Sequence, residues 1–189
     1  MKINREQALQ LLHSHMQNQN LRRHCYCVEV VMRALARRLG GDEQIWGLLG
    51  LLHDGDYEVT KEDWSKHTLL MIEWLTEKEH GDPELIQALQ SHNAQRTGFD
   101  GPKTKMEWAL ACCDELTGFI VAVALVRTDK KLAAVEVDSV LKKFPQKEFA
   151  KAVNRDGITL CEEKLGIPLR EFVQIALEAM RSIASEIGL

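Results

Sequence analysis

The chain has 189 residues, a formal net charge of −4 at pH 7 and 45% hydrophobic residues. This length and composition are typical of a globular protein that buries its own core without needing disulfides. The acidic balance and the lack of a basic block argue against nucleic acid as the main partner.

The first residues, MKINREQALQLLHS, lack the unbroken apolar stretch of a signal peptide. The most apolar stretch, residues 108–126, contains Asp114 and Glu115 near its middle, so we expect a buried helix there and no membrane span. Five cysteines without a disulfide-framework spacing are expected to be reduced thiols: Cys25, Cys27, Cys112, Cys113 and Cys161. These features together predict a cytoplasmic protein with no membrane partner.

Apolar residues recur at helical spacing along almost the whole chain, and no run of alternating residues predicts a strand. A first helix should begin at Asn4, with Gln7 completing a capping box. Asp42 is expected to cap a third helix, and Asp82 with Pro83 to open a fifth. The other expected helices cover about residues 21–39, 65–78, 104–127, 138–144, 146–153, 154–165 and 168–187.

No linker is long enough to separate domains, so we expect a single all-α domain over residues 1–189. The helices after about residue 130 are rich in charge and carry no cluster of candidate metal ligands. We therefore expect them to support the core or to close a pocket.

Ionisable side chains interrupt the apolar stripes of five predicted helices, where residues three or four positions apart share a face. These side chains are His24, His53, Asp54, His67, His92 and Asp114. Each alone is explained as a hydrogen-bonded core residue, but isolated buried charges cost several kcal/mol each, against a total stability of about 5–15 kcal/mol. A metal centre of imidazole nitrogens and carboxylate oxygens satisfies all six at once, and the sequence predicts one.

The other histidines are weaker candidates, since nothing in the sequence pairs with them. We interpret His13 and His15 as structural and His80 as an exposed loop residue. The segment HCYC, residues 24–27, offers a competing zinc site. The chain has no C-x2-C pair of the kind that structural zinc sites use, so the cysteines are better interpreted as small core residues.

The order of the candidate ligands resembles the HD superfamily of metal-dependent phosphohydrolases. Members carry a histidine on one helix, a His-Asp pair ending another and a distant aspartate on a later helix, matched here by His24, His53-Asp54 and Asp114. His67 and His92 fall where two-metal members carry further histidines.

The segments LLHDGDYE, SHN and CDELTGFIVAVALVR are similar to a small bacterial HD subfamily of largely unassigned function. The resemblance covers about residues 20–130, and the subfamily's helical tail corresponds to residues 131–189. It implies an HD-domain-like helical bundle with additional C-terminal helices.

The resemblance implies one or two divalent ions, with the identity open among Mn, Fe, Ni, Co, Zn and Mg. One ion would use His24, His53, Asp54 and Asp114, and His67 with His92 would hold a second, with Asp54 bridging. Asp54 and Asp56 are the candidate catalytic carboxylates. The candidate ligands for a substrate phosphate are Arg22, Arg23 and Arg96.

One departure from the family concerns Asp56. Many members read His-Asp-Ile-Gly, whereas this chain continues with Gly55, Asp56 and Tyr57, and it has no lysine near the turn before Lys61. Asp56 is therefore a turn residue, an additional ligand or a carboxylate that supports the ligands, and ordinary turn chemistry favours the first interpretation.

The implied function is hydrolysis of a small phosphorylated molecule, with a nucleotide as one candidate, by attack of metal-activated water on phosphorus. No P-loop, nucleophile elbow or dinucleotide fingerprint competes with this prediction. The alternatives are an HD-type diiron oxygenase and a catalytically silent, metal-stabilised binding or regulatory module. A small phosphorylated substrate is the expected partner. Whether the chain forms a homo-oligomer stays open.

Overall fold

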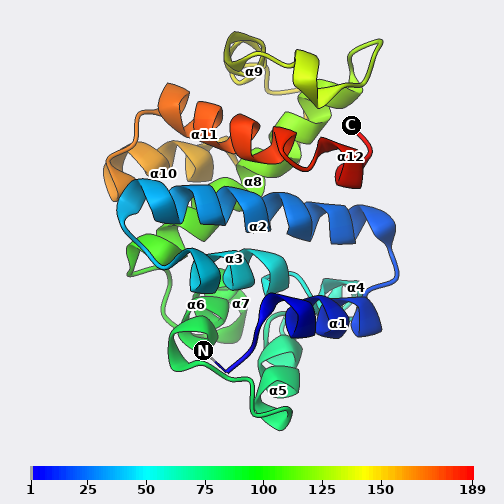
Figure 1. Cartoon of the computed structure of the whole chain (residues 1–189). Helices are drawn as coiled ribbons and strands as arrows, with labels where there is room; N and C mark the ends of the chain where they lie inside the picture. The colour runs from blue at the N-terminus through cyan, green and yellow to red at the C-terminus, as the bar shows by residue number, and fades with distance from the viewer. Residues whose placement is uncertain (1) are drawn as a thin grey trace.

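The structure is a computed structural model that describes residues 2–189. Over that range it contains helices, turns and loops but no strand, which confirms the predicted all-α fold (Figure 1). The helices are α1 (Arg5–His15), α2 (Gln19–Leu39), α3 (Glu43–Leu52), α4 (Tyr57–Thr60), α5 (Leu69–Glu77), α6 (Pro83–His92), α7 (Ala94–Thr97), α8 (Lys105–Leu125), the 3-10 helix η1 (Leu132–Ala134), α9 (Val137–Lys143), α10 (Arg155–Leu165), α11 (Leu169–Arg181) and α12 (Ala184–Ile187).

The helix ends that the sequence marks are confirmed. The Asn4 side chain accepts a hydrogen bond from the Gln7 amide at 2.9 Å, and the Gln7 side chain accepts one from the Asn4 amide at 3.0 Å. Asp42 and Asp82 cap α3 and α6 through their side chains. Gly40 ends α2 with φ at +75°, a conformation that glycine adopts without strain.

The helix predicted over residues 65–78 begins only at Leu69. Residues 61–68 form turns instead, and Thr68 has φ at +70°, which is unusual for a β-branched residue. This left-handed step turns the chain into α5 directly after His67. Unusual backbone of this kind persists where the surrounding structure holds it, and here it adjoins a candidate ligand.

Two C-terminal predictions also need correction. Residues 146–153 form turns and no helix, because the Arg155 guanidinium donates hydrogen bonds to the backbone carbonyls of that region, including those of Gln146 and Val153. The predicted helix over 168–187 is divided into α11 and α12 by a break at Ser182 and Ile183.

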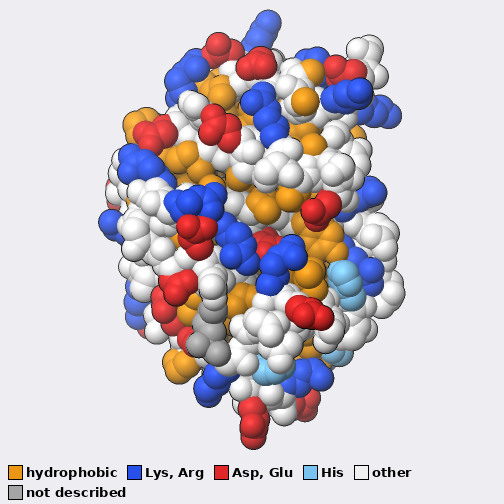
Figure 2. Space-filling model, viewed as in Figure 1, with side chains coloured by type: hydrophobic (Ala, Val, Ile, Leu, Met, Phe, Trp, Pro, Cys, Tyr) orange, Lys and Arg blue, Asp and Glu red, His pale blue; other side chains and the backbone are white. Residues whose placement is uncertain are grey.

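Helices α2 and α3 make the most extensive contact, and α8 packs against α2, α6 and α10 (Figure 1). The length and composition of α8 would suffice to cross a membrane, but more than half of that stretch is buried among other helices. The C-terminal α10 and α11 pack on α8 and α2, in agreement with a supporting role for the tail. On the face shown in Figure 2, basic and acidic side chains are interspersed.

Every residue from Ile45 to Leu52 of α3 is buried, and Gly50 lies directly against the backbone of α2. A methyl group at Gly50 would lie 2.8 Å from the Val28 carbonyl oxygen and 2.9 Å from the Glu29 Cα. These are backbone atoms, which a side-chain rotation cannot move away. Gly50 therefore allows the contact that brings the end of α3 beside α2.

We expect Gly50→Ala to destabilise the protein by about 1–3 kcal/mol, because overpacking against backbone outweighs the gain in helix propensity. The free energy of unfolding in urea measures this. Gly118→Ala is the matched control, since Gly118 is exposed in α8 with no atom within 4 Å of the added methyl group. The control should gain about 0.5–1 kcal/mol, and equal stabilisation by both substitutions would contradict the close contact.

Candidate metal centre

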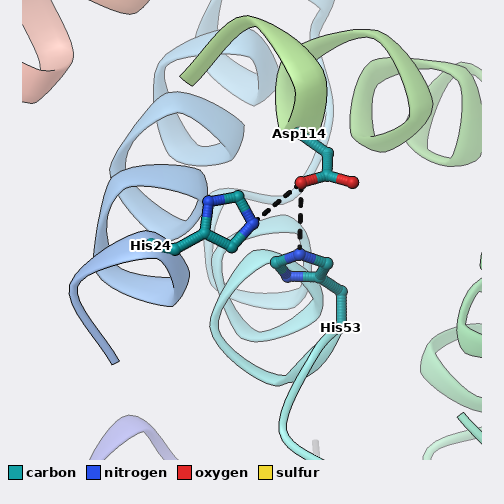
Figure 3. Close-up of side chains that lie close together, drawn as sticks. All are labelled: His24, His53 and Asp114. Carbon is teal, nitrogen blue, oxygen red and sulfur yellow. Dashed lines mark ion pairs between the residues drawn. The ribbon is translucent and has the colours of Figure 1, made fainter. Parts of the chain in front are cut away.

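The six predicted ligands lie together, although they come from separate parts of the chain. His24 comes from α2, and His53 and Asp54 follow α3. His67 precedes α5, His92 is the last residue of α6, and Asp114 lies in the middle of α8. Figure 3 shows His24 and His53 both directed at one oxygen of Asp114.

One side of the cluster surrounds that Asp114 oxygen. His24 Nε2 lies 2.8 Å and His53 Nε2 3.5 Å from Asp114 Oδ1. The same two nitrogens lie 3.7 Å and 3.6 Å from Asp54 Oδ2. The ligand atoms of His24, His53 and Asp114 all lie within 4.8 Å of one another, and those of His53, Asp54 and His92 form a second such group.

The other side of the cluster surrounds the second oxygen of Asp54. His67 Nε2 lies 3.3 Å and His92 Nε2 3.5 Å from Asp54 Oδ1. The two oxygens of this one carboxylate thus face different pairs of imidazoles, the arrangement expected of a bridging ligand.

The distances fit a set of metal ligands better than a set of hydrogen bonds. Most nitrogen–oxygen distances in the cluster are 3.3–3.7 Å, which is long for a hydrogen bond. Adjacent ligand atoms about 2.0–2.2 Å from a shared cation lie about 2.8–3.6 Å apart in octahedral or tetrahedral geometry. The fully buried His53 Nε2 has no hydrogen-bond partner in the described chain, so it is free to bind a cation.

Backbone and carboxylate groups fix the orientation of two of the imidazoles. His53 Nδ1 lies 2.8 Å from the Gly50 carbonyl oxygen, which can only accept, so Nδ1 carries the proton. His67 Nδ1 lies 2.8 Å from Asp56 Oδ1. Both contacts leave Nε2 directed at the cluster, as the supporting partners of metal-binding histidines do.

Asp56 is fully buried behind His67 and does not line the cavity beside the cluster. Its second oxygen accepts a hydrogen bond from the Met71 amide at 3.0 Å, in the first turn of α5. Both of its oxygens are engaged away from the cavity, so its placement favours the alternative of a carboxylate that supports the candidate ligands over a catalytic role. Asp56 is a positioning residue for His67, and only its backbone belongs to the turn.

The carboxylates keep the cluster ionised when no cation is bound. Burial alone would lower the pKa of His53, but the charges of Asp54 and Asp114 outweigh it and raise this pKa to about 9. Burial likewise opposes protonation of His67, and Asp54 and Asp56 raise its pKa to about 9. Although burial opposes their charge, the histidines hold the pKa values of Asp54 and Asp114 well below the usual range.

These shifts predict how the stability of the chelator-treated protein depends on pH. A histidine whose folded pKa is about 9 stabilises the fold fully below its unfolded pKa of about 6.5, and this contribution is lost as the pH rises through 9. The thermal midpoint should therefore fall from pH 6.5 to pH 9. With a divalent metal present, the fall should be smaller, because the cation replaces the protons. Equal falls with and without metal would contradict the prediction.

A cavity of about 620 Å³ opens beside the cluster. Asp54, His67, His92 and Asp114 form its floor. Tyr57 of α4, Trp64 of the turns after it, and residues in and around α7, among them Asn93 and Arg96, contribute walls. The remaining wall includes three residues of the tail, Asn154, Gly157 and Leu160, so the tail helps to close the pocket.

Of the three predicted substrate-binding arginines, the structure brings only Arg96 to the cavity. Arg22 donates hydrogen bonds to the carbonyl oxygens of Met16 and His13, so it satisfies the end of α1. The Arg23 guanidinium lies beside Gly188, near the C-terminal end of the chain. The placement of Arg22 and Arg23 corrects the expectation for both.

The sequence did not indicate two residues that support the cluster through hydrogen bonds. The Asn93 side chain donates hydrogen bonds to the carbonyl oxygens of Trp64 and His67, at 2.8 Å and 3.0 Å, which ties the turn segment to α6. Thr117 donates to the Asp114 carbonyl oxygen at 2.8 Å and lies 3.5 Å from His24 Nδ1. Asn93 directly follows the candidate ligand His92, and Thr117 lies three positions after Asp114. This proximity in sequence was the one available indication of their role.

The weaker candidates lie outside the cluster. His15 stacks on Trp74 with ring centroids 3.6 Å apart, and His13 lies 2.6 Å from the Tyr26 hydroxyl. His80 is partly buried, which corrects its expected exposure. All five cysteines are free and buried, as predicted, and no group of potential metal ligands within residues 2–189 includes one of them.

Comparisons with protein-family models, with curated proteins and with solved structures found no match. The geometry of the site is therefore the basis for inferring a function.

Proposed function

We propose that the chain is a metal-dependent phosphohydrolase that acts on a small phosphorylated molecule. The supporting observation is the position of Asp54, whose two oxygens face two separate imidazole pairs at the floor of a cavity. His24, His53, Asp114 and Asp54 would hold one divalent cation, and His67, His92 and Asp54 a second. The donor set leaves coordination positions open toward the cavity, which suits catalysis better than a purely structural role.

Divalent cations in this position supply a water of lowered pKa and an electrophile for a phosphoryl oxygen. The protein's own groups would orient the ligands and bind the substrate. The Gly50 carbonyl and Asp56 keep His53 and His67 in the tautomer and orientation that present Nε2 to the cation. Arg96, at the cavity wall, is suited to bind a non-bridging phosphoryl oxygen through its guanidinium.

Metal analysis of the protein, followed by a panel of phosphomonoesters and phosphodiesters, tests the proposal. The panel is run with each of Mn²⁺, Fe²⁺, Co²⁺, Ni²⁺, Zn²⁺ and Mg²⁺, in air and without oxygen. We expect hydrolysis that a chelator abolishes, that added metal restores and that oxygen does not affect. Turnover that requires oxygen would instead favour a diiron oxygenase. Bound metal without turnover on the whole panel would favour a silent binding or regulatory module.

A further inference from the structure

The cavity beyond the metal centre has very little positive charge. Of the described residues that line it, Arg96 is the only lysine or arginine, and it forms no ion pair within residues 2–189. The nearby Lys103 pairs with Asp100, and Lys164 pairs with Glu163. Arg96, together with the proposed metal ions, is therefore the unpaired positive charge that the described lining offers to a substrate.

Acidic groups on the cavity wall add to this imbalance. Glu107 is saturated, because it accepts hydrogen bonds from the Gln87 side chain and from the amides of Lys103 and Thr104. Glu115 lies one residue from Asp114 and accepts one hydrogen bond, from the Asn154 amide at 3.0 Å. A second phosphoryl or a carboxyl group on the substrate would meet Glu115, while the ammonium of Lys164 is already paired with Glu163, so like-charge repulsion disfavours such a group.

Trp108 offers a flat apolar surface in the same cavity. It precedes Asp114 by six residues in α8, which corresponds to about 9 Å along the helix axis. Ala111 lies between them, three positions from each, and its small side chain leaves the space over the helix open. The Lys164 ammonium lies over one face of the indole ring, 5.1 Å from its centre, and leaves the other face for a ligand, while Leu110 and Leu160 extend the apolar wall.

From this arrangement, and on the basis of the proposed phosphohydrolase function, we infer the substrate class. The substrate carries a single phosphoryl group, bound at the metal centre and Arg96, and an uncharged planar group that packs on Trp108. The rigid indole provides contact area at low entropic cost, and aromatic pairs gain from offset or edge-to-face contact. Glu115 excludes molecules with a second anionic group.

Equilibrium binding tests this inference without requiring turnover. Calorimetry on the metal-loaded full chain compares three non-hydrolysable ligands, namely methylphosphonate, phenylphosphonate and benzene-1,4-diphosphonate. We expect phenylphosphonate to bind about tenfold more tightly than methylphosphonate, and the diphosphonate to bind more weakly than phenylphosphonate. Glu115→Gln should reduce the penalty on the diphosphonate.

Variants of Trp108 assign the preference for the ring. Trp108→Ala should lose most of the tenfold advantage of phenylphosphonate while methylphosphonate affinity stays within about twofold, and Trp108→Phe should keep most of it. Trp74→Ala is the matched control, because Trp74 stacks on His15 away from the cavity, and it should change neither affinity.

The outcomes separate this inference from the proposed function. Equal affinity for phenylphosphonate and methylphosphonate, a preference for the diphosphonate, or no phosphonate binding by the metal-loaded protein would overturn the inference. If the ligands bind as expected but no phosphoester is hydrolysed, the inferred ligand preference of the cavity is supported and the proposed hydrolase activity is wrong.

Discussion

Asp54→Ala should release both metal ions and reduce phosphoester hydrolysis to background while leaving most of the helix content in place. Each oxygen of Asp54 faces a different pair of imidazoles, so its removal takes one ligand from each cation at once. It also removes a negative charge that lies within 3.7 Å of four histidines. Metal-to-protein ratios, activity and circular dichroism of the purified variant measure the three effects.

Asp63→Ala is the control for this substitution. Asp63 is an exposed aspartate in the neighbouring turn segment, where it pairs with Lys66 and Ser65 and does not line the cavity. This variant should keep both metal ions and full activity. Full metal occupancy in Asp54→Ala would show that Asp54 is not a ligand and would remove the basis of the proposed function.

His67→Gln should release one metal ion of two and should lower activity far more than stability. His67 Nε2 faces only Asp54 Oδ1, on the side of the cluster that His92 shares. His24, His53 and Asp114 are untouched by the substitution, so the other cation keeps its ligands. The metal-to-protein ratio of the variant, compared with the wild type, decides between one cation and two.

If His67 only fills the core, His67→Gln would keep the metal content and lose on the order of 1–3 kcal/mol of stability. His15→Gln is the control, because His15 stacks on Trp74 outside the cluster and should leave the metal content unchanged. Asp56→Asn separately tests whether Asp56 positions the His67 imidazole. Loss of a carboxylate that orients a metal-binding histidine typically weakens metal affinity 10–100-fold, so this variant should weaken one cation and spare the other.

Helix positions and caps were predictable because they depend on neighbours in the chain. The Asn4 capping box and the caps at Asp42 and Asp82 are formed by residues within three positions of one another. The prediction over residues 146–153 was wrong for the opposite reason. Backbone carbonyls there accept hydrogen bonds from the side chain of Arg155, a residue outside the segment. This contact, and not local helix propensity, set the conformation of the segment.

Inward placement identified the candidate ligands, but it does not by itself distinguish a metal ligand from a structural carboxylate. Glu29 is only 1% exposed in α2, yet it is neutralised by Arg5 and Arg33 and belongs to no metal cluster. Glu107 is similarly buried and serves the start of α8. Both occupy apolar helix faces, as the carboxylates of the cluster do. They differ from those carboxylates in the groups that the folded chain places beside them.

The sequence by itself therefore determined the all-α class, most helix ends and the six residues of the cluster, because helical periodicity and capping are encoded within a few residues. Only the tertiary structure decided that the two oxygens of Asp54 face separate imidazole pairs, that Asp56 lies behind His67 and that Arg96 alone of three arginines reaches the cavity. Periodicity shows which face of a helix is buried. The rotation and separation of one helix relative to another depend on how side chains pack, down to the contact of Gly50 with the backbone of α2, and these set which polar atoms meet.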